Sequence, residues 1–337
     1  MHNGTLPWTA GAATGVGSMP GEDIGEAVAV AFGECPELPF LPELPARGVG
    51  ADLIGRGAAL LAGLHVDLQP AGWRLVDRGG LDERRARSLL SRDLDTLEEH
   101  AGSYAGPLKV QAVGPWTLAA TVELPRGGRA LADVGAARDL AAALAEGMRV
   151  HLADVARRVP AATLLLQLDE PALPAVLAAR VPTASGFRTL RSVSPQVART
   201  ALESVLAAAA AAGAIPVVHC CAQDVPVELL VAAGARAVSL DLTRLPRRAE
   251  DDLGTAVESG VGLLLGVLPS IGEEVSDPAP SVDLVNSLWR RLGLPAEELS
   301  KVVLTPTCGL ANASPGYARA ALRLCREAAR RLDSGRS

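Results

Sequence analysis

The stretch "SVLAAAAAAGAIPVVHCC" (residues 204–221) joins two segments of different character. Its first part is an alanine- and leucine-rich segment typical of a helix, and its second part is a short apolar run typical of a buried strand. The run is continuously apolar rather than alternating, as in parallel strands that helices cover on both faces. We therefore predict a helix over 194–212, followed by a parallel strand over 215–221.

The same alternation of helix and strand patterns recurs along the chain. Further strands are predicted at 13–18, 38–44, 108–114, 163–169, 236–242, 262–268 and 302–308. Further helices are predicted at 22–32, 50–63, 133–157, 225–233, 247–259, 281–292 and 314–333. Eight such units predict an α/β fold of the TIM-type (β/α)8 barrel kind, with an open doubly wound sheet as the alternative. No GxGxxG motif opens a helix after the first strand, which counts against a dinucleotide-binding fold.

The domain organisation predicted from this pattern is simple. Residues 1–337 form one barrel domain, with a core from about residue 12 to residue 325, because no linker is long enough to separate two domains. Residues 64–92 do not fit a single strand and helix unit. We expect them to form a hairpin or a small insertion.

Composition excludes several classes of partner. The net charge is −6 without acidic or basic blocks, and aromatic residues make up only 3%, so we expect neither nucleic acid nor a membrane surface as partner. The N-terminus lacks a basic segment followed by an apolar one, and the uncharged stretch 204–218 falls short of the about 18 residues of a spanning helix. We expect a soluble, cytoplasmic protein, in which clustered cysteine and histidine indicate metal binding or catalysis.

In a barrel, chemistry lies at the carboxyl ends of the strands. His219 and Cys221 are two residues apart on one strand, so their side chains share a face, while Cys220 points toward the helices. Cys308 ends the last predicted strand, and Asp241 ends the strand next to His219. These four residues form a candidate zinc site.

Two readings of this cluster remain open at this point. Cysteine and histidine are also common as small or satisfied core residues. In the metal reading, two thiolates suit a zinc that binds a third, incoming thiol, and a bound thiol is deprotonated. That chemistry points to alkyl transfer to a thiol rather than to water activation.

Other strand ends offer groups for binding a substrate. In "LLLQLDEPAL" (164–173), Asp169 and Glu170 provide carboxylates for an ammonium group or cap the following helix beside Pro171. In "GVGSMPG" (15–21), backbone N–H groups at Gly17 and Ser18 could hold a carboxylate. Glu43 in "LPELPARG" is a weaker candidate. The remaining cysteines are assigned to packing or surface positions and three histidines to the surface: Cys35, Cys220, Cys325, His65, His100 and His151.

Five motifs occur in the order found in the catalytic half of cobalamin-independent methionine synthase, and the chain resembles that family from residue 12 to about residue 325. These motifs are "GVGSMPG", "VGPWTLA", "LQLDEPAL", "VVHCC" and "LTPTCGLA". The resemblance implies a TIM barrel whose zinc binds homocysteine as a thiolate. It implies His219, Cys221 and Cys308 as zinc ligands, Gly17 and Ser18 for the carboxylate of the amino acid, Asp169 for its ammonium group, and Glu43 as a second acid.

The chain also departs from the family pattern. The duplicated N-terminal barrel of the full-length enzymes is absent, as in short single-barrel members. The fourth zinc ligand of the family is a glutamate, whereas this chain offers Asp241. Ala175 and the histidine-free "GVLPSIGEE" stand where folate-using enzymes have a glutamate and a histidine. The resemblance to short members then implies a corrinoid or a corrinoid protein, rather than methyltetrahydrofolate, as methyl donor.

The function expected from sequence is a zinc-dependent S-methyltransferase of methionine biosynthesis. It transfers a methyl group to the homocysteine thiol, and we assign no protein side chain as nucleophile. One alternative is methyl or alkyl transfer between a corrinoid protein and a different thiol. The other is a zinc-holding accessory protein without catalysis.

Overall fold

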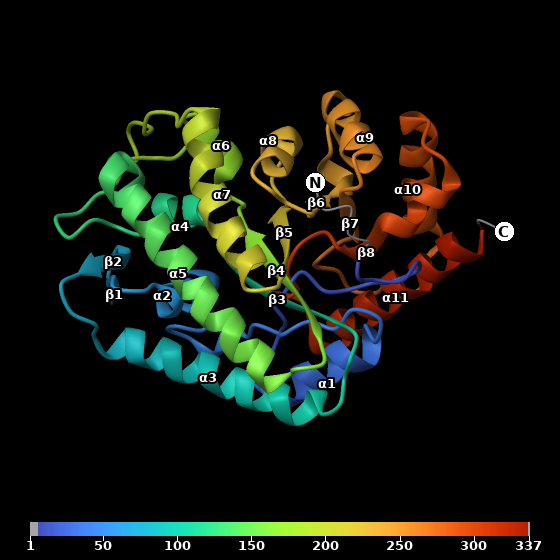
Figure 1. Ribbon diagram of the computed structural model, residues 1–337, viewed down its shortest axis with the longest axis horizontal. Coiled ribbons are helices and arrows are strands. Elements are labelled where there is room, and N and C mark those ends of the chain that lie inside the picture. The colour runs from blue at the N-terminus through green and yellow to red at the C-terminus, as the bar shows by residue number, and fades with distance from the viewer. Residues whose placement is uncertain (1–5, 336–337) are drawn as a thin grey trace.

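A computed structural model describes residues 6–335. Six parallel strands form a curled sheet in the order β3-β4-β5-β6-β7-β8, and helices surround it (Figure 1). The strands are β3 Pro107–Val113, β4 Thr163–Asp169, β5 Ile215–Cys220, β6 Ala237–Asp241, β7 Gly262–Leu268 and β8 Val302–Pro306. The longer helices are α1 Ile24–Glu34, α2 Leu53–Leu60, α3 Leu81–Ala101, α5 Val134–Arg158, α7 Pro195–Ala211, α9 Glu250–Glu258, α10 Ala279–Leu292 and α11 Pro315–Ser334. Shorter helices are α4 Pro115–Thr121, α6 Leu173–Leu177 and α8 Val227–Ala232.

Two irregular segments close the sheet between β8 and β3. Ala13 bridges to Leu304, Ser18 to Glu43, and Phe40 to Lys109, all in parallel orientation. The predicted strands 13–18 and 38–44 therefore occupy the expected places in the barrel, although they pair through isolated bridges rather than continuous ladders. The fold is a TIM-like barrel, as predicted.

The segment 64–92 is partly as expected. β1 His65–Gln69 and β2 Gly72–Val76 form an antiparallel hairpin, which confirms the predicted insertion. The sequence prediction missed α3, which starts inside this segment, and also missed α4 and α6. In α3 the buried apolar stripe is interrupted by buried Glu83 and Asp93, which masks its helical periodicity.

The packing places the polar residues at one end of the barrel. An apolar cluster fills the interior near the start of the strands; it comprises Trp8, Ala12, Leu38, Leu165, Val217, Ala237, Leu264 and Val303. Each fully buried large side chain of this kind stabilises the fold by about 1.5–3 kcal/mol. The inward positions that follow along the strands carry polar side chains, so the candidate site lies beyond the apolar cluster, at the carboxyl ends of the strands.

Within residues 6–335, no helix has both the length and the apolar character needed to cross a membrane.

Candidate functional site

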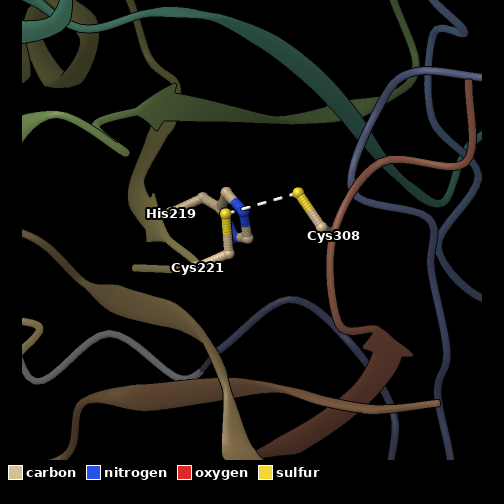
Figure 2. Close-up of side chains that lie close together, drawn as sticks. All are labelled: His219, Cys221 and Cys308. Atoms are coloured by element: carbon tan, nitrogen blue, oxygen red, sulfur yellow. Dashed lines mark hydrogen bonds between the residues drawn. The ribbon is translucent and has the colours of Figure 1, made fainter. Parts of the chain in front are cut away.

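Three predicted side chains converge at the mouth of the barrel. His219 comes from β5, Cys221 directly follows that strand, and Cys308 lies two residues beyond β8 (Figure 2). One ligand atom from each lies within 4.8 Å of the others. The two Sγ atoms are 3.3 Å apart. Residues 87 positions apart in sequence thus form one cluster because β5 and β8 open onto the same end of the barrel.

The imidazole of His219 is oriented by a hydrogen bond at its Nδ1 atom. Its Nδ1 atom lies 2.8 Å from Ser239 Oγ on the neighbouring strand β6, and both residues are buried. Its Nε2 atom is buried and has no hydrogen-bond partner among residues 6–335. In the tautomer that can bind a metal through Nε2, Nδ1–H donates to Ser239, an arrangement common for metal-binding histidines. A buried nitrogen without a partner costs about 1–3 kcal/mol, and a metal ion would satisfy it.

The two thiols differ strongly in acidity. The hydrogen bond from Cys221, followed by the effect of nearby His219, lowers the pKa of Cys308 to about 4. The same hydrogen bond, together with burial, raises the pKa of Cys221. One imidazole and two sulfurs match the ligand preference of zinc and leave a position for a further ligand.

The other cysteines lie apart from this cluster. Cys220 is fully buried in the core between sheet and helices, and burial raises its pKa to about 12. Burial likewise raises the pKa of Cys35 to about 12 and that of Cys325 well above its usual value. These three cysteines are packing residues, as the alternation along the strand predicted for Cys220.

Asp241 does not lie in the cluster. Its Oδ1 accepts hydrogen bonds from Thr243 N at 2.9 Å and Thr243 Oγ1 at 2.6 Å. Asp241 thus caps the short 3-10 turn Leu242–Arg244 that follows β6. The structure brings together three of the four predicted ligands, and the backbone N–H and the hydroxyl of Thr243 engage the fourth.

The predicted substrate-binding residues include two that lie beside this cluster, Ser18 and Asp169. We call Gly17, Ser18, Asp169 and Glu43 the predicted clamp. Ser18 lies against the loop of Cys308: its carbonyl accepts a hydrogen bond from Leu310 N at 2.8 Å, and a Cβ at Gly309 would lie 2.0 Å from Ser18 Oγ. The backbone that carries Cys308 therefore touches the segment predicted to bind a carboxylate.

Asp169 and Glu43 are both buried and already hydrogen-bonded. Asp169 pairs with His219 in the β4–β5 register and accepts a hydrogen bond from Gln167 Nε2 at 2.7 Å. Burial raises the pKa of Asp169 to about 7, although nearby His219 opposes this shift. Glu43 Oε1 lies 3.3 Å from Arg56 Nε and accepts from Gln111 Nε2 at 3.2 Å.

The other acid of "LLLQLDEPAL" has a different partner from the one expected. Glu170 accepts hydrogen bonds from the backbone N–H groups of Trp116 and Thr117, each at 2.8 Å, and from the Thr117 hydroxyl at 2.7 Å. It thus caps α4, which follows the neighbouring strand, rather than its own helix. Burial raises the pKa of Glu170 to about 7 despite these donors. Its role is to fix the "GPWT" turn.

The surface assignment of the remaining histidines is wrong for one of them. His151 is only 5% exposed on the inner side of α5, and burial, with Arg56 as the next cause, lowers its pKa to about 4. His65 is partly exposed beside Glu83, at 3.0 Å. His100 is exposed on α3 and contacts the edge of the Phe32 ring.

Sequence analysis missed three buried polar residues beneath the predicted clamp, Lys109, Gln111 and Gln167. A signal was available, since Lys109 is one of only two lysines in the chain and interrupts an apolar strand. Its partners could not be read from sequence, because they come from other strands.

Comparison with known protein families supplies the decisive observation. A family model described as "Cobalamin-independent synthase, Catalytic domain" matches residues 93–331, more than half of the chain. The chain belongs to this family. The matched part of this cobalamin-independent synthase domain contains Asp169, His219, Cys221 and Cys308, and membership makes the chain a catalytic domain of methyltransferase type in methionine synthesis.

One solved structure supports the fold of this cobalamin-independent synthase domain, and two others are similar only at a lower level. A B12-independent methionine synthase from Shewanella sp. W3-18-1, in complex with selenomethionine, superposes with a TM-score of 0.58 at 11% identity, over 98% of this chain and 96% of that chain. Methylaspartate ammonia lyase from Clostridium tetanomorphum gives 0.41 at 14% identity, over 88% and 58%. D-psicose 3-epimerase from Clostridium cellulolyticum H10 gives 0.38 at 12% identity, over 73% and 83%. No curated protein sequence matched the chain.

The family description corrects one expectation from sequence. A corrinoid methyl donor is at odds with a cobalamin-independent synthase domain. The residues that prompted the expectation, Ala175 and the histidine-free segment after β7, are absences, and absences do not identify a donor.

Proposed function

We propose that the protein is a zinc-dependent S-methyltransferase that converts homocysteine to methionine. One observation carries the proposal: the unpartnered Nε2 of His219 lies together with two thiols, beside a segment and an acid suited to bind an amino acid. A nitrogen and two sulfurs would hold zinc, and the free position would take the substrate sulfur. Five free cysteines support a reducing, cytoplasmic location, because the site needs its thiols reduced.

The protein's own residues orient the substrate. Backbone N–H groups at Gly17 and Ser18 bind the carboxylate of homocysteine, and Asp169 binds its ammonium group. Because Ser18 contacts the Cys308 loop, the thiol of a substrate held this way is directed toward the three-residue cluster. This placement converts an encounter of two reactants into a reaction within one oriented complex.

The chemistry is a balanced displacement. Zinc held by His219, Cys221 and Cys308 would supply a Lewis acid that lowers the pKa of the substrate thiol. The thiol proton leaves to solvent, the sulfur electron pair forms a new bond to the methyl carbon, and the bond between methyl and donor breaks with its electrons passing to the donor. Methionine and a demethylated donor result.

The test is a donor panel with the zinc-loaded full chain and L-homocysteine. Methyltetrahydrofolate is the first donor, since the family is cobalamin-independent, and methylcobalamin is the comparison. We expect methionine from wild type, and none above background from Cys308→Ser. Wild-type protein that purifies without zinc under chelator-free conditions contradicts the metal site. Fully loaded protein that yields no methionine from any donor contradicts the transferase.

A further inference from the structure

A lysine without any solvent exposure lies in the barrel interior beneath the predicted clamp. Lys109 on β3 donates from Nζ to the Val16 carbonyl at 2.9 Å and to Gln111 Oε1 at 3.3 Å. The Phe40 ring centroid lies 5.4 Å from Nζ. Burial lowers the pKa of Lys109 to about 8, which leaves it a cation with three N–H donors at neutral pH.

The side-chain amides of Gln167 and Gln111, both buried, connect Lys109 and the Val16 carbonyl to the acids of the predicted clamp. Gln167 Nε2 donates to the same Val16 carbonyl at 2.8 Å and to Asp169 Oδ1 at 2.7 Å. Gln111 Nε2 donates to Glu43 Oε1 at 3.2 Å. Because Val16 directly precedes Gly17 and Ser18, this network joins all three parts of the predicted clamp.

Stability alone does not account for Lys109. A buried ammonium costs several kcal/mol of desolvation, and an apolar residue of similar volume is often neutral or stabilising at such a site. In the described part of the chain, no carboxylate forms a direct ion pair with Lys109, and the nearby charges of Asp169 and Glu43, which raise its pKa, offset the desolvation cost only in part. Residues that break a local folding rule in this way concentrate at functional sites.

We propose that Lys109 is a positioning residue for recognition of the amino-acid end of the thiol substrate, a role that rests on the proposed function. With Gln167 it fixes the Val16 carbonyl, and this sets the direction of the Gly17 and Ser18 N–H groups. Gln167 in turn occupies one oxygen of Asp169 and leaves the other for an ammonium group. Lys109 itself touches no substrate, so its loss changes how the amino acid is recognised and leaves the metal cluster intact.

The test compares two thiols on the zinc-loaded full chain by calorimetry. L-Homocysteine carries both groups that the clamp recognises, whereas 1-propanethiol carries neither. Lys109→Met is expected to weaken homocysteine binding about tenfold to a hundredfold. Its propanethiol affinity and its zinc content are expected to remain as in wild type.

The chain offers a matched control in its only other lysine. Lys301 also donates to a backbone carbonyl, that of Val257, at 3.0 Å, but it lies before β8 and away from the mouth. Lys301→Met is expected to leave both affinities unchanged. Gln167→Leu, which removes the donor shared by Val16 and Asp169, provides a second variant if Lys109→Met does not fold, and the same selective loss is expected.

Three results would overturn the role. Variant proteins that bind homocysteine as wild type does show that the network does not position the clamp. An equal loss for both thiols shows general damage rather than positioning. Wild-type protein that binds propanethiol but not homocysteine instead refutes the proposed substrate, and the role of Lys109 falls with it.

Discussion

The two sides of the barrel mouth differ in how completely their polar groups are satisfied. On the side of β5, β6 and β8, the Nε2 atom of His219 has no hydrogen-bond partner among the described residues, and the two Sγ atoms lie 3.3 Å apart. On the side of β3 and β4, the charged groups of Lys109 and Asp169 already have hydrogen-bond partners. In the proposed function an external ion completes the first side, whereas hydrogen bonds within the protein already organise the second.

Removing a ligand from the first side is expected to have the largest effect. Cys308→Ser or His219→Ala leaves too few ligands for tight binding, so zinc affinity should fall about a hundredfold or more. Cys221→Ser should behave alike. Metal content after dialysis measures the loss.

Cys220→Ser is the matched control, because Cys220 is adjacent in sequence but packs toward the helices. It should retain zinc in full. Loss of zinc from Cys220→Ser would show that the assignment of the two neighbouring cysteines is reversed.

On the side of β3 and β4, burial of Lys109 should make the free energy of unfolding depend on pH. The folded-state pKa of Lys109 is about 8 against an ordinary 10.5, so the unfolded chain binds more protons between these values. The contribution of Lys109 to stability is therefore present above about pH 10.5 and lost as pH falls to about 8, a change of about 3 kcal/mol. The difference in free energy of unfolding between wild type and Lys109→Met, measured by denaturant titration at pH 8 and pH 10.5, should change by that amount in favour of wild type at the higher pH. A difference independent of pH contradicts the buried cation.

A smaller loss of zinc affinity is expected when Ser239, the hydrogen-bond partner of His219, is changed. Ser239→Ala removes the partner of Nδ1 but no metal ligand, so zinc affinity should fall about 10- to 100-fold. Competition with a chelator of known affinity measures it, and Ser239→Thr, which keeps the hydroxyl, should recover most of the loss. An unchanged affinity in Ser239→Ala would show that the neighbouring core alone orients the imidazole.

The smallest effect is expected at Asp241. Its carboxylate is engaged by Thr243, so Asp241→Asn should change zinc affinity by less than about threefold, a fraction of one kcal/mol. The same chelator competition applies. A loss as large as that of Cys308→Ser would instead identify Asp241 as a fourth ligand.

Sequence was most informative where one local rule decides the outcome. Alternation along a strand separates Cys221 from Cys220, and the barrel rule brings the ends of β5 and β8 to the same mouth, so the cluster of His219, Cys221 and Cys308 could be predicted. The barrel itself followed from eight repeated units. The rest depends on partners from distant parts of the chain.

Two misses show this dependence, and a third, His151, does not. Glu170 caps α4, a helix that follows another strand, so no local pattern reveals it. Asp93 is fully buried in α3 because Arg47 and Arg56 neutralise it, and this pairing conceals an inward face among charged residues. His151 could have been found, since it follows Leu144 and Met148 on the buried stripe of α5 at helical spacing.

The close approach of Gly309 to Ser18 has a consequence for the length of the substrate that fits at the barrel mouth. A Cβ at residue 309 would lie 2.0 Å from the Ser18 hydroxyl oxygen, so glycine lets the Cys308 loop pack directly against the Ser18 segment. In the proposed enzyme the separation between these two segments is spanned by the carbon chain between the carboxylate and the sulfur of the substrate. A bulkier residue at position 309 would therefore push the two segments apart and change the length of amino acid that fits between them in the proposed enzyme.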